Sequence, residues 1–361
     1  MWRKFRVTLG KMKIFAIALI LLTRLQALSP ERIVSIEKAL EAERERQGIV
    51  GMSAAIVVSG DLKWTRGFGL SDLENNVPAR AATMYRLGSI AKPITATAVM
   101  QLVEKGTIDL DEPIHRYVPQ FPRKTWVVSV RQLLGHLGGV RTYQGDEMGS
   151  TKHYGGVIEP LSIFIDDPLA VEPGTQYLYS TYGYNLLGAA VELASGLKFA
   201  HYLHAQVFMP AKIEFIVPDN LFAIIPNRSR GYKAGPGGKL ENCILADTSN
   251  KISGGGLVGT AEDVARFASA LARGLLVTPR TLELMSTSLK LKDGSQTGYG
   301  LGLGIGTYAG HRTFSHEGGQ PGTRTIMAIL PDDHTTIALM TNTETAKQRT
   351  LLEVLIRAMF D

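Results

Sequence analysis

Strand-forming segments lie near the two ends of this chain, and helix-forming segments fill the region between them. The patterns of residues 52–58 and 62–69 predict two strands, joined by a hairpin at Ser59-Gly60-Asp61. Further strand patterns come only after about residue 300. Strands from both ends must pair to bury one core. The pattern therefore predicts an α+β fold, with one antiparallel sheet built from both chain ends, flanked by helices, and a mainly helical inserted region.

The sheet region is expected at about 31–110 and 290–361, and the helical region at about 111–289. The predicted C-terminal strands are 300–308, 312–316, 325–330 and 336–341, with a turn at Pro331-Asp332-Asp333. Apolar residues at helical spacing predict helices over 31–47, 89–104, 184–194, 260–273 and 344–359. We expect a cleft where the sheet meets the helical region.

The first 28 residues differ from the rest of the chain in composition. A basic run over residues 3–13 precedes nine apolar residues, Ile14 to Leu22, and Leu25-Gln26-Ala27 resembles a signal peptidase site. This order predicts a signal peptide over 1–27, a mature domain over 28–361 and a periplasmic or secreted location. The apolar run is shorter than the roughly 20 residues that span a bilayer, which disfavours the alternative of an uncleaved membrane anchor. A mitochondrial presequence is the third interpretation, but such segments are amphipathic.

The N-terminal segment also accounts for the basic charge of the chain. Six of the 39 Lys and Arg residues lie in it, so 33 remain to balance 33 Asp and Glu. A domain without excess positive charge gives no indication of a nucleic-acid partner. Cys243 is the single cysteine, which excludes an intrachain disulfide. His201 and His204 lack the Glu of a zinc-binding His-Glu-x-x-His, so we expect neither a metal nor another cofactor.

A Ser-x-x-Lys sequence occurs three times, at Ser35/Lys38, Ser89/Lys92 and Ser195/Lys198. On a helix this spacing puts the hydroxyl and the amine on one face, where a desolvated, neutral lysine can accept the serine proton. The first pair lies inside a charged helix and the third at a helix end, so both are expected to be structural. Ser89 instead lies at a predicted helix start, where its backbone N–H and the helix dipole can face an oxyanion. On its own, this pair is either a nucleophile, Ser89, with Lys92 as its partner, or a helix cap with a solvated lysine.

Two later segments carry groups that such a nucleophile needs. Residues 173–184 concentrate hydroxyl groups before an apolar helix, and a phenol there could relay a proton between nucleophile and leaving group. Ser315-His316-Glu317-Gly318-Gly319 lies at a strand edge, where glycines permit close substrate approach and offer a second oxyanion N–H. No Gly-x-Ser-x-Gly sequence is present, so an α/β-hydrolase fold is not supported.

In this order, the three elements resemble those of the serine β-lactamase-like hydrolases, the family related to penicillin-binding proteins, class C β-lactamases and the esterases derived from them. The similarity runs from about residue 33 to 360. It includes Leu133-Leu134-Gly135-His136-Leu137-Gly138-Gly139, which resembles a structural turn of the family, and residues 254–263, which resemble its helix-opening segment. Residues 109–113 and 117–122 look closest to the branch of the mitochondrial β-lactamase-like proteins, which is thought of as peptidase-like.

The resemblance implies a role for each candidate residue. Ser89 would be the nucleophile, Lys92 the general base and Tyr179 the proton shuttle. The backbone N–H groups of Ser89 and Gly319 would form the oxyanion hole, with Gly318 beside the substrate.

Two positions depart from the family pattern. His316, which we place among the catalytic residues, stands where the β-lactamases carry a lysine that helps hold the substrate carboxylate. A mostly neutral imidazole would hold a carboxylate less strongly. Thr181, a predicted substrate contact, stands where many relatives have an asparagine that contacts the acylamide side chain. Both changes argue against efficient antibiotic hydrolysis.

The sequence therefore predicts an exported serine hydrolase that forms an acyl-enzyme on Ser89 and cleaves amide or ester bonds in a small-molecule or peptide substrate. It would act as a peptidase or esterase rather than as an efficient β-lactamase, without a membrane partner once the signal is removed. The alternative is a binding module of the same fold that acylates slowly or not at all, and serves as a penicillin-binding sensor or a self-assembling scaffold.

Overall fold

One antiparallel sheet of seven strands carries the fold. The computed structural model describes residues 28–361, and the predicted signal peptide, residues 1–27, lies outside the described residues. The strands lie in the order β3-β2-β1-β12-β11-β10-β9. Their bounds are β1 (Gly51–Val58), β2 (Asp61–Asp72), β3 (Val77–Pro78), β9 (Gly304–Tyr308), β10 (His311–Gln320), β11 (Thr323–Leu330) and β12 (Thr335–Thr341). Because β1 pairs with β12, the predicted α+β fold with a sheet built from both chain ends is confirmed.

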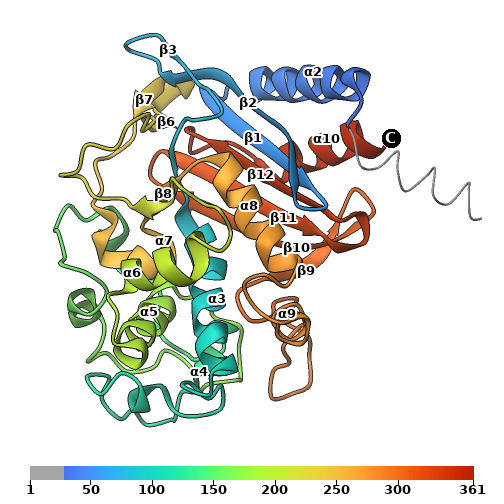
Figure 1. Cartoon of the computed structure of the whole chain (residues 1–361). Coiled ribbons are helices and arrows are strands. Elements are labelled where there is room, and N and C mark those ends of the chain that lie inside the picture. The colour runs from blue at the N-terminus through green and yellow to red at the C-terminus, as the bar shows by residue number, and fades with distance from the viewer. Residues whose placement is uncertain (1–27) are drawn as a thin grey trace, which may run out of the picture.

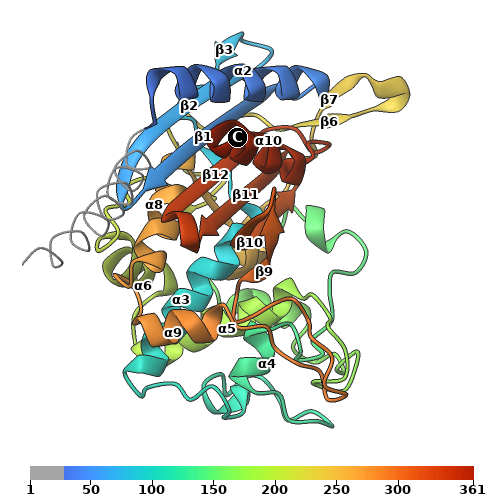
Figure 2. The same ribbon diagram turned by 90° about the vertical axis from the view of Figure 1, so that its right-hand side faces the viewer.

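Both faces of the sheet are covered by helices. Every residue of β1 is buried, and neighbours such as Ala54 and Ala55 enter two different cores because successive side chains point to opposite faces. The core of Ala54 lies under α2 (Pro30–Arg46) and α10 (Gln348–Phe360), and that of Ala55 under α8 (Ala261–Ala272). Figure 1 and the turned view in Figure 2 show this layering.

The other helices gather at one end of the sheet around α3, as Figure 1 shows. Their bounds are α3 (Ala91–Glu104), α4 (Val130–Leu134), α5 (Thr181–Ser195), α6 (Phe199–Leu203), α7 (Ile252–Gly255) and α9 (Pro279–Met285). Helix α3 is buried along nearly its whole length, which fits its small and apolar residues on all sides. It therefore forms the centre of the helical region and carries Lys92 into the interior.

Two small sheets separate from the seven-stranded sheet were not predicted. They contain β4 (Tyr85–Arg86), β8 (Leu257–Gly259) and β5 (Val217–Pro218) in one, and β6 (Tyr232–Ala234) and β7 (Leu240–Asn242) in the other. Strands of two or three residues are too short to show an alternating pattern in the sequence. Within residues 28–361, none of the helices has the length and apolar composition that a membrane crossing requires.

Two predicted elements begin four residues later in the structure than in the sequence prediction. The strand predicted over 300–308 begins only at Gly304, because the chain turns at Gly302, where φ is +90°. The last helix was predicted from residue 344 but begins at Gln348, after a turn in which the Ala346 N–H donates to the Thr343 carbonyl at 3.2 Å. In both places the prediction is wrong at the start of the element and correct for the rest.

Asn342 should contribute strongly to stability, because its buried side chain connects three strand ends. Its Oδ1 accepts the Gly51 N–H at 2.7 Å, and its Nδ2 donates to the Leu70 carbonyl at 3.0 Å. Asn342→Ala would leave both backbone groups without these partners, so we expect a loss of about 2–4 kcal/mol in the free energy of unfolding. Urea denaturation measures this loss. The exposed Asn75→Ala is the control, and an equally small change in both variants would contradict the prediction.

Candidate active site

Ser89 lies on a tight turn that packs against the edge of β10. The turn is a 3₁₀ helix, Gly88–Ile90, and α3 follows it directly, so Ser89 does lie at a helix start. Gly88 has a φ of +54°, and a Cβ there would lie 2.7 Å from the backbone nitrogen of Gly319. A Cβ at Gly318 would lie 2.1 Å from the Leu87 carbonyl oxygen. Glycine at both positions lets the turn and the strand approach closely, and it brings the backbone of Ser89 and Gly319 to one wall of the site.

The edge of β10 beside Ser89 is open because its neighbour is short. Strand β9 pairs with β10 only from His311 to Ser315. The segment from His316 to Gln320 is therefore bonded to β11 on one side and has no strand partner on the other among the described residues, and its glycines lie against the Ser89 turn. This is the edge that the sequence predicted for substrate approach.

Lys92 is completely buried beneath Ser89. Its Nζ lies 3.0 Å from Ser89 Oγ, 3.2 Å from Thr181 Oγ1 and 2.7 Å from the Gly254 carbonyl oxygen. A neutral amine has two N–H bonds and one lone pair, so it can donate to the Gly254 and Thr181 oxygens and accept the Ser89 O–H. Thr181, which was predicted to contact the substrate, thus holds Lys92 in place.

The surroundings of Lys92 favour this neutral form. Burial, and after it the positive charge of Lys251, lowers the pKa of Lys92 well below its usual value of 10.5. No carboxylate lies within ion-pair distance of Lys92 among residues 28–361 to oppose this effect. A proton-accepting amine at 3.0 Å from a serine hydroxyl is the arrangement that activates such a nucleophile.

Tyr179 lies over Lys92 at the mouth of the site. The centre of its ring is 4.7 Å from Lys92 Nζ and 4.2 Å from the centre of the His136 ring. Burial of the phenol raises the pKa of Tyr179, and a hydrogen bond with Ser89 partly offsets the rise. The residue is nevertheless 37% exposed, so water reaches part of the ring and we expect only a moderate rise. At neutral pH the phenol keeps its proton and can pass one on.

His316 is buried in the same region but bonds to groups other than the nucleophile. Its Nδ1 lies 2.7 Å from the Glu317 carbonyl oxygen, and its Nε2 lies 2.9 Å from Tyr299 Oη. Because a carbonyl only accepts, Nδ1 carries the proton and Nε2 accepts the Tyr299 hydroxyl. Burial of the imidazole is the main effect that lowers the pKa of His316, to about 3. The imidazole is therefore neutral at physiological pH.

Three residues of the site were not singled out in the sequence. His136 packs against Tyr179 and accepts the Ser180 N–H on Nδ1 at 3.2 Å; it belongs to a segment interpreted only as a turn. Tyr299 bonds to His316 but lies in no motif that would have marked it. Lys251 is 2% exposed and lies beside the Gly254 segment that was interpreted as structural. The order Lys251-Ile252-Ser253-Gly254 offered no signal of its own.

Two cavities open on either side of Tyr179. The smaller, about 230 Å³, contains Ser89, and it is lined by Gly88, Ser89, Thr142, Tyr143, Met148, Tyr179, Thr181, Lys251, Gly254, Gly255, Gly319 and Gln320. The larger, about 710 Å³, contains His316 and runs along β9 to Arg349 and Glu353. Tyr179 lines both, so a substrate held at Ser89 could extend in two directions.

The other two Ser-x-x-Lys pairs lie away from this site. Ser35 and Lys38 are exposed on α2. Ser195 donates to the Val191 carbonyl at 2.6 Å within its own helix, and Lys198 pairs with Glu192 at 2.8 Å. Across residues 28–361, no three or more His, Cys, Asp or Glu side chains gather as a metal site would require.

Comparison with known proteins agrees with this geometry. A family model described as "Beta-lactamase" matches residues 36–358, nearly the whole described chain. The chain belongs to the beta-lactamase family. The resemblance seen in the sequence is thereby confirmed, and with it membership of a group of serine hydrolases that includes esterases and penicillin-binding proteins.

Relatives of this beta-lactamase family member come from several kinds of organism. The human mitochondrial serine beta-lactamase-like protein LACTB is 28% identical over 396 residues, covering 83% of this chain and 72% of that protein. Esterase EstB of Burkholderia gladioli is 29% identical over 300 residues, covering 73% of this chain and 76% of that esterase. Among solved structures, a D-amino acid amidase from Ochrobactrum anthropi SV3 superposes with a TM-score of 0.80 at 24% identity, covering 91% of this chain and 98% of that one.

The buried His316 should make stability depend on pH. Its pKa is about 3 in the folded protein, whereas an unfolded histidine titrates near 6.5. The unfolded state therefore binds the proton first, and stability is lost as pH falls from about 6.5 towards 3, while it is intact above 6.5. His316→Gln should lower the slope of unfolding free energy against pH by up to about 1.4 kcal/mol per pH unit in this window.

Urea unfolding at several pH values between about 4.5 and 7 measures this slope for His316→Gln. The exposed His201→Gln is the matched control. A slope in His316→Gln equal to that of the unchanged protein would show that folding does not lower the pKa of His316.

Proposed function

We propose that this protein is an acyl-transfer hydrolase that forms an acyl-enzyme on Ser89 and cleaves ester or amide bonds. The observation that carries the proposal is the buried Lys92 amine, 3.0 Å from Ser89 Oγ, with Thr181 Oγ1 and the Gly254 carbonyl as its other hydrogen-bond partners. A lysine held in this way is oriented as well as neutral, so its lone pair points to the serine proton. A helix cap with a solvated lysine would leave the amine free to rotate in water.

In the proposed acylation, Ser89 Oγ attacks the substrate carbonyl carbon while its proton passes to Lys92. The backbone N–H groups of Ser89 and Gly319 stabilise the oxyanion. Tyr179 then delivers a proton to the leaving group as its bond to carbon breaks, and Tyr179 recovers a proton from Lys92. In deacylation, water takes the place of the leaving group and the same groups act in reverse, which returns Ser89 to its hydroxyl form.

The proposed substrates are esters or amides of small molecules or peptides, in preference to β-lactam antibiotics. His316 is neutral at physiological pH and its ring nitrogens already have partners, so it offers no cation for the carboxylate of such an antibiotic. Thr181 is engaged by Lys92. The naming of one relative as an esterase, and of a structural neighbour as a D-amino acid amidase, supports this choice.

The test combines active-site labelling with turnover. A fluorophosphonate probe should label Ser89, and peptide mapping should find no label on Ser35 or Ser195. p-Nitrophenyl esters and D-alanyl peptides should be hydrolysed faster than nitrocefin. Both Ser89→Ala and Lys92→Met should lose at least about 1,000-fold in kcat/KM, because the two side chains act as a unit.

Ser195→Ala is the matched control, since it removes a serine of the same sequence pattern outside the site. Labelling of Ser89 without any steady-state turnover would favour the slow-acylating sensor or scaffold and contradict a hydrolase. Labelling elsewhere would reject the assignment of the nucleophile.

The basic, apolar and small-residue order of residues 1–27 supports export to the periplasm or the extracellular space. We expect the mature protein to begin near Leu28, because the candidate cleavage site ends at Ala27. N-terminal sequencing of the protein from fractionated cells tests this. The mitochondrial relative shows that the family is not confined to one compartment. A soluble cytoplasmic form that retains Met1 would overturn the proposal.

A further inference from the structure

A second buried lysine lies in the cavity of Ser89. Lys251 is 2% exposed, and it lines the 230 Å³ cavity together with Ser89, Tyr143 and Gln320. Its Nζ donates to the Met148 carbonyl at 2.7 Å and lies 5.2 Å from the centre of the Tyr143 ring. An ammonium group has three N–H donors, so one hydrogen bond leaves most of its capacity unused.

Lys251 also lacks a counter-ion of its own. Among residues 28–361, no carboxylate oxygen lies within 4.0 Å of its Nζ, although Asp219 and Asp247 act on it from farther away. Both carboxylates have other partners: Asp219 pairs with Arg86 at 2.8 Å, and Asp247 with His153 at 2.8 Å. A buried cation without a paired anion is costly, which makes its presence in a cavity beside a nucleophile a sign of ligand binding.

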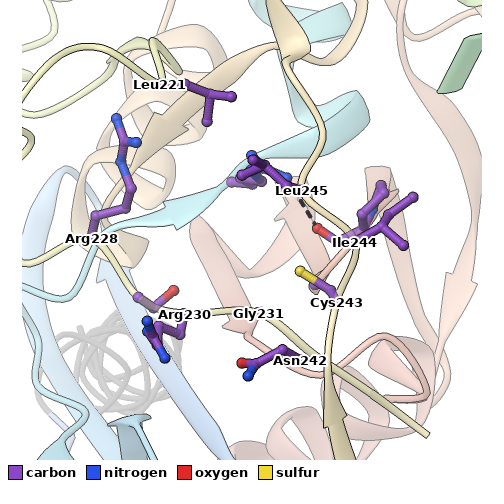
Figure 3. A pocket seen from close by; sticks show the side chains of 12 residues that line it. Leu221, Arg228, Arg230, Gly231, Asn242, Cys243, Ile244 and Leu245 are labelled. Atoms are coloured by element: carbon purple, nitrogen blue, oxygen red, sulfur yellow. Dashed lines mark hydrogen bonds between the residues drawn. The ribbon is translucent and has the colours of Figure 1, made fainter. Parts of the chain in front are cut away.

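The cations of another pocket differ from Lys251 in having carboxylate partners. Figure 3 shows it, about 320 Å³ in volume, with Arg228 and Arg230 among its lining side chains. Arg228 donates to the Asn220 carbonyl at 2.7 Å and lies 3.7 Å from Asp219, and Arg230 pairs with Glu74. The cations of that pocket are thus compensated within the protein, whereas Lys251 is not.

A second polar group without a partner among residues 28–361 lines the same cavity. Gln320 is 4% exposed and lines the same cavity, yet neither its Nε2 nor its Oε1 has a hydrogen-bond partner among the described residues. Buried side-chain amides are nearly always bonded. The Gln320 amide is thus a second polar group beside this cavity whose hydrogen-bonding capacity the described residues leave unused.

The charge of Lys251 is suited to binding an anion. Burial, followed by the charge of Arg86, lowers its pKa to about 8. That value is still above neutral pH, so most of the population carries the charge, and a bound carboxylate would raise the pKa again.

We propose that Lys251 binds a carboxylate carried by the acyl part of the substrate. This inference rests on the proposed acyl-enzyme at Ser89. The leaving group is assigned to the larger cavity, where Tyr179 and His316 lie, and the acyl group to the smaller cavity that Ser89 shares with Lys251. The preferred substrates are thus esters or amides of an acidic acyl group, such as a dicarboxylic acid joined through one end.

A matched pair of substrates tests this preference. Each is the p-nitrophenyl monoester of a four- to six-carbon dicarboxylic acid, with the other end a free carboxylate or its carboxamide. The two differ in charge and hardly in shape. We expect kcat/KM for the carboxylate to exceed that for the carboxamide at least about tenfold in the unchanged protein, as for a charge-assisted hydrogen bond. Uncatalysed hydrolysis is subtracted for each ester.

Lys251→Met removes the charge and leaves an unbranched side chain that is shorter by one atom. The ratio of the two kcat/KM values should then fall at least about tenfold, whatever the change in overall rate. The exposed Lys152→Met is the control for general loss of positive charge, and it should keep the ratio. A loss of both activities in equal proportion would assign Lys251 to the chemistry or to folding and overturn the proposal.

The ratio in the unchanged protein keeps the proposal testable even if Lys251→Met does not fold. Hydrolysis of both esters through Ser89 at equal kcat/KM would reject the carboxylate site and leave the proposed function intact. Absence of any Ser89-dependent hydrolysis would instead reject the proposed function itself.

Discussion

The exclusion of water from Lys92 is the constraint on which the site depends. A buried amine must satisfy its hydrogen bonds within the protein, and Lys92 does so with Ser89, Thr181 and Gly254. These partners come from the 3₁₀ turn before α3, from the start of α5 and from α7, so three elements must meet at one point. Burial of Lys92 destabilises its charged form and so favours the neutral amine. The burial itself results from the packing of the helical region.

The sheet contributes the other half of the site through one close contact. The edge of β10 lies against the Ser89 turn, and it can do so because Gly88 and Gly318 have no side chains to separate them. The two halves also meet at Tyr179, where each contributes one imidazole. His136 and His316 pack beside Tyr179 from the helical region and from the sheet, so the position of the phenol is determined by both halves of the molecule.

The sequence predicted those parts of the structure that have a local pattern. Alternating strands at both ends predicted the sheet, and the helix-start position of Ser89 separated it from Ser35 and Ser195. Tyr179 and His316 were predicted because each lies in a motif, and the structure brings their rings to 6.4 Å from each other. Lys251, Tyr299 and the partner role of His136 could not be found, because they depend on contacts between residues far apart in the chain. The early start assigned to β9 failed for a local reason, a glycine turn that the strand pattern did not reveal.

The position of β1 has a consequence for how the chain is assembled. β1 is bonded to β2 on one side and to β12 on the other, with Val58 opposite Thr335. A ribosome makes β1 long before β12, so one edge of this apolar strand remains unpaired while the whole helical region is synthesised. Contacts of such long sequence separation fold slowly and leave strand edges open to association with other chains. For this topology, any protection of the nascent chain has to last until β12 has been made.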